Sequence, residues 1–163
     1  MDHVDEIIKQ WAAERPDLDT KPMALLGRLL KLQQHTSKAM ADNFSQYGLN
    51  TSSFDVLATL RRSGPPYQLS PGALINMTMV TSGTMTNRID QLVKAGFVER
   101  IKNPDDGRGF LIALTEKGFK LVDDAVTTHV VTQKELTDRL SDEDRNTLNA
   151  LVKKYLATFE NEA

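Results

Sequence analysis

A run of small polar residues at the expected start of a helix is the most informative chemical feature of the sequence. The run consists of Ser82, Gly83, Thr84, Thr86 and Asn87. Side chains of this size let a helix N-terminus enter the major groove of DNA, where they can contact base edges and phosphates, and asparagine can bond adenine through two hydrogen bonds. We interpret the five residues as candidate DNA contacts. The alternative is that they only cap and begin the helix.

Two basic residues belong to or precede a stretch rich in turn residues, 103–109, further along the chain. Lys102 precedes the stretch and Arg108 lies within it. If the stretch is the tip of a β-hairpin, Arg108 at the tip and Lys102 at the base could reach the minor groove and the DNA backbone. In the alternative, Arg108 pairs with Asp106. We favour DNA binding over the alternative that this region serves only contacts with other proteins.

The sequence lacks the patterns that enzymes, cofactors and metal ions require. It has no cysteine, so disulfides and thiolate sites are excluded. The three histidines are scattered, the acidic runs at 123–124 and 142–144 are typical of solvated or capping charges, and Gly107-Arg108-Gly109 is too short for a dinucleotide motif. We therefore expect no catalytic residue, no metal and no cofactor.

Hydrophobic spacing predicts three helices in the first part of the chain. A short helix begins after Asp2, a long one runs from Pro22 to Gly48, and a third, capped by Thr51 or Ser52, ends at Gly64. The first and second helices carry apolar stripes on one face.

The next segment contains two successive helix starts followed by two β-prone segments. Ser70 with Pro71 begins one helix, and Thr81 caps a second that ends at Gly96. Segments 97–102 and 110–115 favour strands. The order helix, helix, helix, strand, strand predicts a winged helix-turn-helix over 51–115, with 82–95 as the DNA-reading helix.

The terminal helices carry more apolar surface than a core of this size should absorb. The last helix is predicted to point five side chains inward: Leu148, Leu151, Val152, Tyr155 and Phe159. We expect 1–48 and 116–163 to pair with a second copy in a two-fold dimer, the alternative being ordinary intrachain core. The fold class is mainly α with a small β-hairpin, in one domain over 1–163.

Length and charge are consistent with this interpretation but add little to it. The chain has 163 residues and a formal net charge of −2. Residues 21–62 carry 6 basic and 2 acidic side chains, whereas both ends are acidic. No apolar run approaches the ~20 residues of a membrane span, and the start is acidic where a signal peptide is basic. A cytoplasmic protein without membrane contact is expected.

Over nearly its full length the sequence resembles the MarR family of bacterial transcription regulators. The most diagnostic element is Asp106, one residue, Arg108, followed by Leu114-Thr115, two residues and Gly118. The other matching segments are 81–92 and 94–100. The resemblance implies a homodimer that binds pseudo-palindromic operators and usually represses. Two positions depart from the family pattern and reduce its positive charge: Asn87 stands where a basic residue is frequent, and the wing has one arginine.

A narrower resemblance is to the urate-responsive branch, including the pectinase-repressor type, which carries an N-terminal helical extension. The positions that respond to ligand in that branch are matched by Trp11, Asp55, Arg88 and Arg100. The resemblance implies that Trp11 shields a purine and that the two arginines hold the negative charge of this purine. It also implies that the bound anion disturbs the interactions of the Asp55 carboxylate.

The helical position of Arg88 is compatible with this implied site. Arg88 lies at the flank of the apolar stripe, so it could face the helix of Asp55, and an Asp55–Arg88 pair could act as a latch. The alternative is a structural salt bridge without effector, with Trp11 in the core. Two other functions remain open: a regulator that answers phenolic or lipophilic anions, and a protein-interaction module that binds no DNA.

Overall fold

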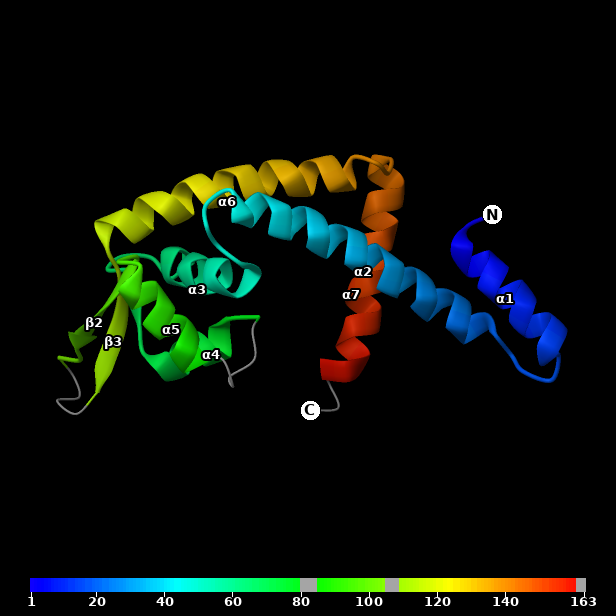
Figure 1. The fold of residues 1–163 in the computed structure, drawn as a ribbon, viewed down its shortest axis with the longest axis horizontal. Coiled ribbons are helices and arrows are strands. Elements are labelled where there is room, and N and C mark those ends of the chain that lie inside the picture. Colours follow the sequence, from blue (N-terminus) through cyan, green and yellow to red (C-terminus); the bar gives the residue numbers. More distant parts are fainter. Residues whose placement is uncertain (80–84, 105–108, 161–163) are drawn as a thin grey trace. The chain divides into compact units, whose positions relative to one another are not determined.

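The distribution of apolar residues produces a mostly helical protein with one small sheet (Figure 1). The computed structural model describes residues 1–79, 85–104 and 109–160. The helices are α1 (His3–Glu14), α2 (Lys21–Ser45), α3 (Thr51–Arg62), α4 (Pro71–Met77), α5 (Met85–Lys94), α6 (Glu116–Thr137) and α7 (Asp142–Glu160), and the strands are β1 (Gln68–Leu69), β2 (Val98–Lys102) and β3 (Phe110–Leu114). Chain contacts separate two units, Met1–Ala41 and Asp42–Ala163.

The first unit joins α1 to the beginning of α2. Asp2 caps α1 as expected, in a capping box with Asp5. The guanidinium of Arg28 on α2 donates to both carboxylates, with Nε 2.8 Å from an Asp2 oxygen, and holds the pKa of Asp2 below its usual value. The pKa of Asp5 is lowered first by the hydrogen bond from the backbone N–H of Asp2 and then by Arg28. Val4 is buried and packs near Gly27, which leaves room for it. These contacts fix the N-terminal helix on the long one.

The core of the second unit lies between α3, the sheet, α5 and α6. Leu57, Leu60, Leu74 and Ile112 are fully buried there. The rings of Phe44 and Phe54 stack with centroids 4.1 Å apart, so the end of α2 is anchored on α3. Figure 1 shows α3, α4 and α5 grouped beside the sheet, the arrangement of a winged helix-turn-helix.

The sheet has one strand more than the sequence predicted. The hairpin is confirmed, because β2 and β3 pair antiparallel from Val98 opposite Leu114 to Lys102 opposite Phe110. In addition, β1 pairs with β3, which gives the order β1-β3-β2. With two residues, β1 is too short to show any alternation of hydrophobic residues.

The helix starts follow local capping chemistry. Ser70 caps α4, at the predicted helix start, and Thr115 caps α6. The predicted cap of α3 was wrong by one residue or two, because Asn50, not Thr51 or Ser52, accepts the backbone N–H of Ser53 at 2.9 Å. Asparagine is as good a cap as serine, so propensity alone did not distinguish the candidates. The predicted cap Thr81 lies outside the described residues.

The apolar face of α7 is not buried within the chain. The sequence placed five of its residues inward, yet α7 has no buried residue. Leu151 is 60% exposed and Phe159 57% exposed. The periodicity identified an apolar face correctly, but a pattern cannot say whether the surface that covers it belongs to the same chain.

Candidate nucleic-acid interface

The reader helix α5 separates a buried face from an exposed polar face. Met85, Ile89 and Leu92 are at most 3% exposed. Thr86 and Asn87, in the first turn, are both exposed. The apolar stripe fixes α5 against its neighbours and leaves these two polar side chains toward solvent. Ser82, Gly83 and Thr84 lie outside the described residues.

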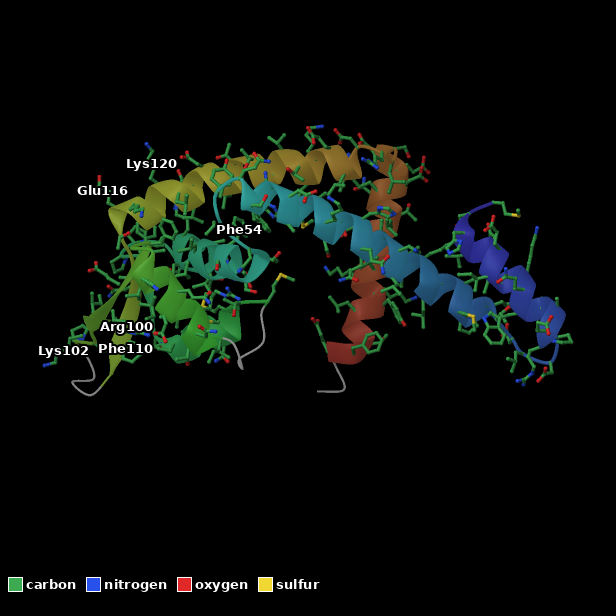
Figure 2. All side chains as sticks on the ribbon, viewed as in Figure 1. Phe54, Arg100, Lys102, Phe110, Glu116 and Lys120 are labelled. Atoms are coloured by element: carbon green, nitrogen blue, oxygen red, sulfur yellow. The ribbon has the colours of Figure 1, made fainter. Side chains whose placement is uncertain are left out.

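The wing, which is the hairpin of β2 and β3, presents basic and aromatic side chains (Figure 2). Lys102 is exposed at the end of β2, as predicted for the hairpin base. Opposite it, Phe110 is 43% exposed, with the Arg100 guanidinium 5.4 Å from its ring centroid. The predicted tip residue Arg108 and its alternative partner Asp106 lie outside the described residues. Lys102 is therefore placed where it can meet a phosphate backbone.

Arg88 faces α3, as its helical position indicated. Its Nη1 donates to Ser53 Oγ at 3.4 Å and to Gln91 Oε1 at 3.0 Å. Its Nε is buried and has no hydrogen-bond partner within the part of the chain that the structure describes. A buried guanidinium N–H without an acceptor is costly, which makes Arg88 unusual among the described side chains.

The predicted Asp55–Arg88 latch is not formed, which corrects the expectation. Asp55 Oδ2 instead accepts the backbone N–H of Met79 at 2.6 Å. The carboxylate thus ties α3 to the segment that follows α4 and leads toward the reader helix. A backbone donor can satisfy a carboxylate as well as a guanidinium does, and residue type does not reveal such a donor.

Arg100 and Trp11 each have other surroundings. Arg100 on β2 forms an ion pair with Asp90 on α5, which fastens the wing to the reader helix. Trp11 on α1, in the first unit, is 41% exposed, so it is not the plain core residue that the alternative supposed. No hydrogen bond or ion pair joins Asp55, Arg88 and Arg100 to one another among the described residues.

Several partners in this region were not foreseen. Ser53, Gln91 and Asp90 bond the two arginines, and Met79 supplies the backbone donor to Asp55. Gln91 lies three residues after Arg88 on the same helix, and this spacing could have identified it. The other three bond side chains on other elements, from 10 to 35 residues away, and required the fold.

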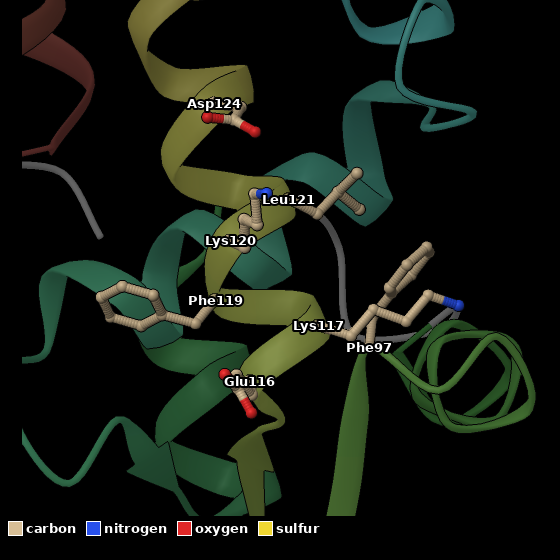
Figure 3. Close-up of a pocket in the computed structure, with 7 residues that line it drawn as sticks. All are labelled: Phe97, Glu116, Lys117, Phe119, Lys120, Leu121 and Asp124. Carbon is tan, nitrogen blue, oxygen red and sulfur yellow. The ribbon is translucent and has the colours of Figure 1, made fainter.

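A separate groove of about 710 Å³ lies along the beginning of α6 (Figure 3). Its lining includes Phe97, Lys117 and Lys120, and none of the four predicted ligand residues.

Within residues 1–79, 85–104 and 109–160, no helix is long and apolar enough to cross a membrane, and no cluster of three histidine or acidic residues could hold a metal ion.

Comparison with known proteins identifies the family. A MarR family model matches residues 47–109. The transcriptional regulator PecS of Dickeya dadantii is 39% identical over 149 residues, which cover 91% of this chain and 90% of that protein. The multiple antibiotic resistance protein MarR of Escherichia coli K12 is 32% identical over 135 residues, covering 80% and 90%.

The solved structures agree with the sequence comparison. Wild-type MarR from E. coli in its apo form superposes with a TM-score of 0.66 at 31% identity, covering 80% of this chain and 96% of that one. A mutant E. coli MarR complexed with operator DNA gives 0.72 at 29% identity, covering 84% and 97%. These similarities confirm the predicted fold class. The protein thus belongs to the MarR family and is a DNA-binding transcription regulator, not an enzyme.

Proposed function

We propose that the protein acts in the cytoplasm as a homodimeric repressor that binds a pseudo-palindromic operator and leaves it when a small aromatic anion such as urate binds. The observation that carries the DNA-binding part is the exposed Thr86 and Asn87 on the solvent face of α5, with a buried stripe behind them. In a two-fold dimer, two such helices enter successive major grooves, and bound protein excludes polymerase from the promoter.

The dimer is supported by apolar surface that the chain leaves uncovered. Leu151, Leu156 and Phe159 on α7 are each more than half exposed, and so are Val130 and Val131 on α6. Exposed apolar side chains in this number are typical of subunit interfaces, where a second copy removes them from water. Residues 1–48 and 116–163 supply the dimerisation helices in this proposal, around the winged helix of 51–115.

The ligand response rests on Arg88 and Asp55. Arg88 holds a buried Nε without a described acceptor, and an anion can accept from it in competition with Ser53 and Gln91. The same anion repels the carboxylate of Asp55, which bonds the backbone of Met79 just before the segment that leads to α5. Loss of that bond loosens the connection to the reader helix and lowers DNA affinity.

Trp11 and Arg100 complete the proposed site by resemblance to the urate-responsive branch. An exposed indole can stack on a purine ring, and a guanidinium that already pairs with Asp90 can exchange that carboxylate for a ligand oxygen. A regulator of phenolic or lipophilic anions would use the same arginines without the purine-specific stacking.

The first experiment titrates the purified protein into its own upstream DNA and then adds urate, with salicylate as the phenolic control. Specific binding that urate reverses and salicylate does not reverse is the expected result. Release by salicylate but not by urate would assign the effector to the phenolic anions. Binding that no anion reverses would refute the ligand response and keep the DNA-binding regulator.

Substitution of Arg88 tests the ligand site. Arg88→Met keeps most of the side-chain volume and removes the guanidinium, so urate should no longer release DNA while binding without urate persists. Arg139→Met, in the exposed turn that follows α6, removes the same charge elsewhere and serves as the matched control. If Arg88→Met responds to urate like the wild type, the proposed site is wrong.

A further inference from the structure

The end of the reader helix is bonded to the beginning of α6 through three consecutive carbonyl groups. Lys117 Nζ donates to the carbonyl of Ala95 at 2.9 Å, and Thr115 Oγ1 donates to that of Gly96 at 2.8 Å. The carbonyl of Phe97 accepts the backbone N–H of Thr115 at 3.1 Å. Carbonyl groups at a helix C-terminus have no hydrogen-bond partner within the helix. Donors at the beginning of α6 therefore bond the carbonyl groups at the end of α5.

Gly118 allows the two helices to approach this closely. A Cβ at Gly118 would lie 1.9 Å from the Phe97 carbonyl oxygen and 2.7 Å from its carbon. Both atoms belong to the backbone, which cannot rotate away as a side chain could. Gly118 therefore sets the separation of α6 from the exit of α5, and any larger residue must push the two apart.

Lys117 adds a contact that fixes direction as well as distance. Its ammonium lies 4.7 Å from the centroid of the Phe97 ring, and Figure 3 shows both side chains on the same side of α6. One cation thus contacts a carbonyl and an aromatic face at once. We name Thr115, Lys117 and Gly118 the exit clamp.

We propose that the exit clamp is a specificity-determining element, because it sets the angle between α5 and α6 and thereby the half-site spacing that the dimer accepts. The proposal rests on the proposed function, in which α6 belongs to the dimerisation region. The 22 residues of α6 span about 33 Å, so a tilt of about 5° at the clamp displaces the far end by about 3 Å. That displacement is comparable to one base-pair step of about 3.4 Å.

The test measures the affinity of the full-length dimer for three operators that differ only in the spacer between half-sites: natural, one base pair longer and one shorter. One base pair turns a half-site by about 35°, so the wild type should prefer the natural spacer by about tenfold or more. Lys117→Met, which keeps the aliphatic chain and loses the donor, should reduce that preference to below about threefold. Lys117→Arg should restore it, because an N–H donor and a cation return.

Two further variants make the result specific to the clamp. Lys120→Met, in the same groove one turn further along α6, should keep the wild-type spacer preference. Gly118→Ala should relax or shift the preference, provided its melting curve shows a folded protein.

The outcomes separate this inference from the proposed function. A variant that is merely destabilised loses affinity for all three operators equally, so an unchanged spacer ratio in Lys117→Met overturns the clamp. Wild-type protein that binds none of the operators contradicts the proposed function instead.

Discussion

At the scale of single residues, Asn87 is the side chain that we propose reads a base. It is exposed in the first turn of α5, two residues after the buried Met85. If Asn87 bonds a base edge, Asn87→Ala should weaken operator binding by about 1–3 kcal/mol while binding to random DNA is unchanged. Fluorescence anisotropy with both DNAs measures the difference.

Lys94 supplies a comparison on the same helix. It is exposed in the last turn of α5, where we expect a cation to contact phosphates rather than bases. Lys94→Ala should weaken binding to both DNAs. It should also reduce, by about 1, the slope of the logarithm of affinity against the logarithm of salt concentration. If Asn87→Ala behaves in this way instead, Asn87 does not read a base.

His129 predicts a pH dependence of stability. Its ring lies 5.0 Å from Phe44 and 4.9 Å from Phe54, and burial lowers its pKa below the ordinary 6.5. The unfolded chain therefore binds a proton at higher pH than the folded chain does. The free energy of unfolding should be highest above pH 6.5 and fall as the pH drops from 6.5 toward the lowered pKa.

Urea unfolding at pH 7.5 and pH 5.5 measures this loss. His129→Phe should reduce the difference between the two pH values, since the group that protonates preferentially in the unfolded state is gone. His35→Phe, on an exposed position of α2, should leave it as in the wild type. An identical pH dependence in His129→Phe and wild type would assign the effect to other groups.

At the scale of elements, two glycines have different roles although both flank or begin helices. Gly96 has a φ of +74° and ends α5, whereas Gly72 lies in the first turn of α4 and has no atom near its missing Cβ. Gly96→Ala should destabilise the fold by about 1–2 kcal/mol because alanine disfavours the left-handed region. Gly72→Ala should stabilise it by about 0.5–1 kcal/mol because alanine favours helix.

Chemical denaturation of the two variants under identical conditions checks this pair. Both substitutions add one methyl group in open space, so packing does not distinguish them and only backbone conformation does. Equal effects of the two substitutions would mean that the helix end tolerates a side chain.

The elements that the sequence predicted well are those specified by neighbouring residues. Ser70, Thr115 and Gly96 act within their own helix ends, so their types and positions suffice. β1 was missed because two residues become a strand only when β3 provides a partner. Elements stabilised mainly by distant chain segments leave little local signal.

In the candidate site, too, features that depend on neighbouring residues were predicted, and features that depend on distant segments were not. The exposed position of Asn87, opposite the apolar stripe, followed from helical periodicity and is confirmed. The partner of Asp55 did not, because a backbone N–H from Met79 competes with the expected guanidinium and no residue type marks it. Arg88 was placed toward α3 correctly, yet its acceptor there is Ser53.

At the scale of the whole molecule, the exposed face of α7 predicts that association and DNA binding depend on each other. Leu151 is 60% exposed, and Leu151→Glu would place a charge within the proposed dimer interface, where its desolvation opposes association. The variant should sediment as a monomer at concentrations where the wild type is a dimer. Because one reader helix then contacts one half-site, operator affinity should fall far more than any single contact explains.

Lys153→Glu distinguishes loss of the interface from a general effect of negative charge on α7. Lys153 is exposed on the same helix, and its substitution changes the net charge by two units, more than Leu151→Glu does. If charge repulsion from DNA were the cause, Lys153→Glu should bind operator at least as poorly as Leu151→Glu. If the apolar face holds the dimer, Lys153→Glu should remain dimeric, and raising the concentration of Leu151→Glu should recover both the dimer and operator binding in parallel.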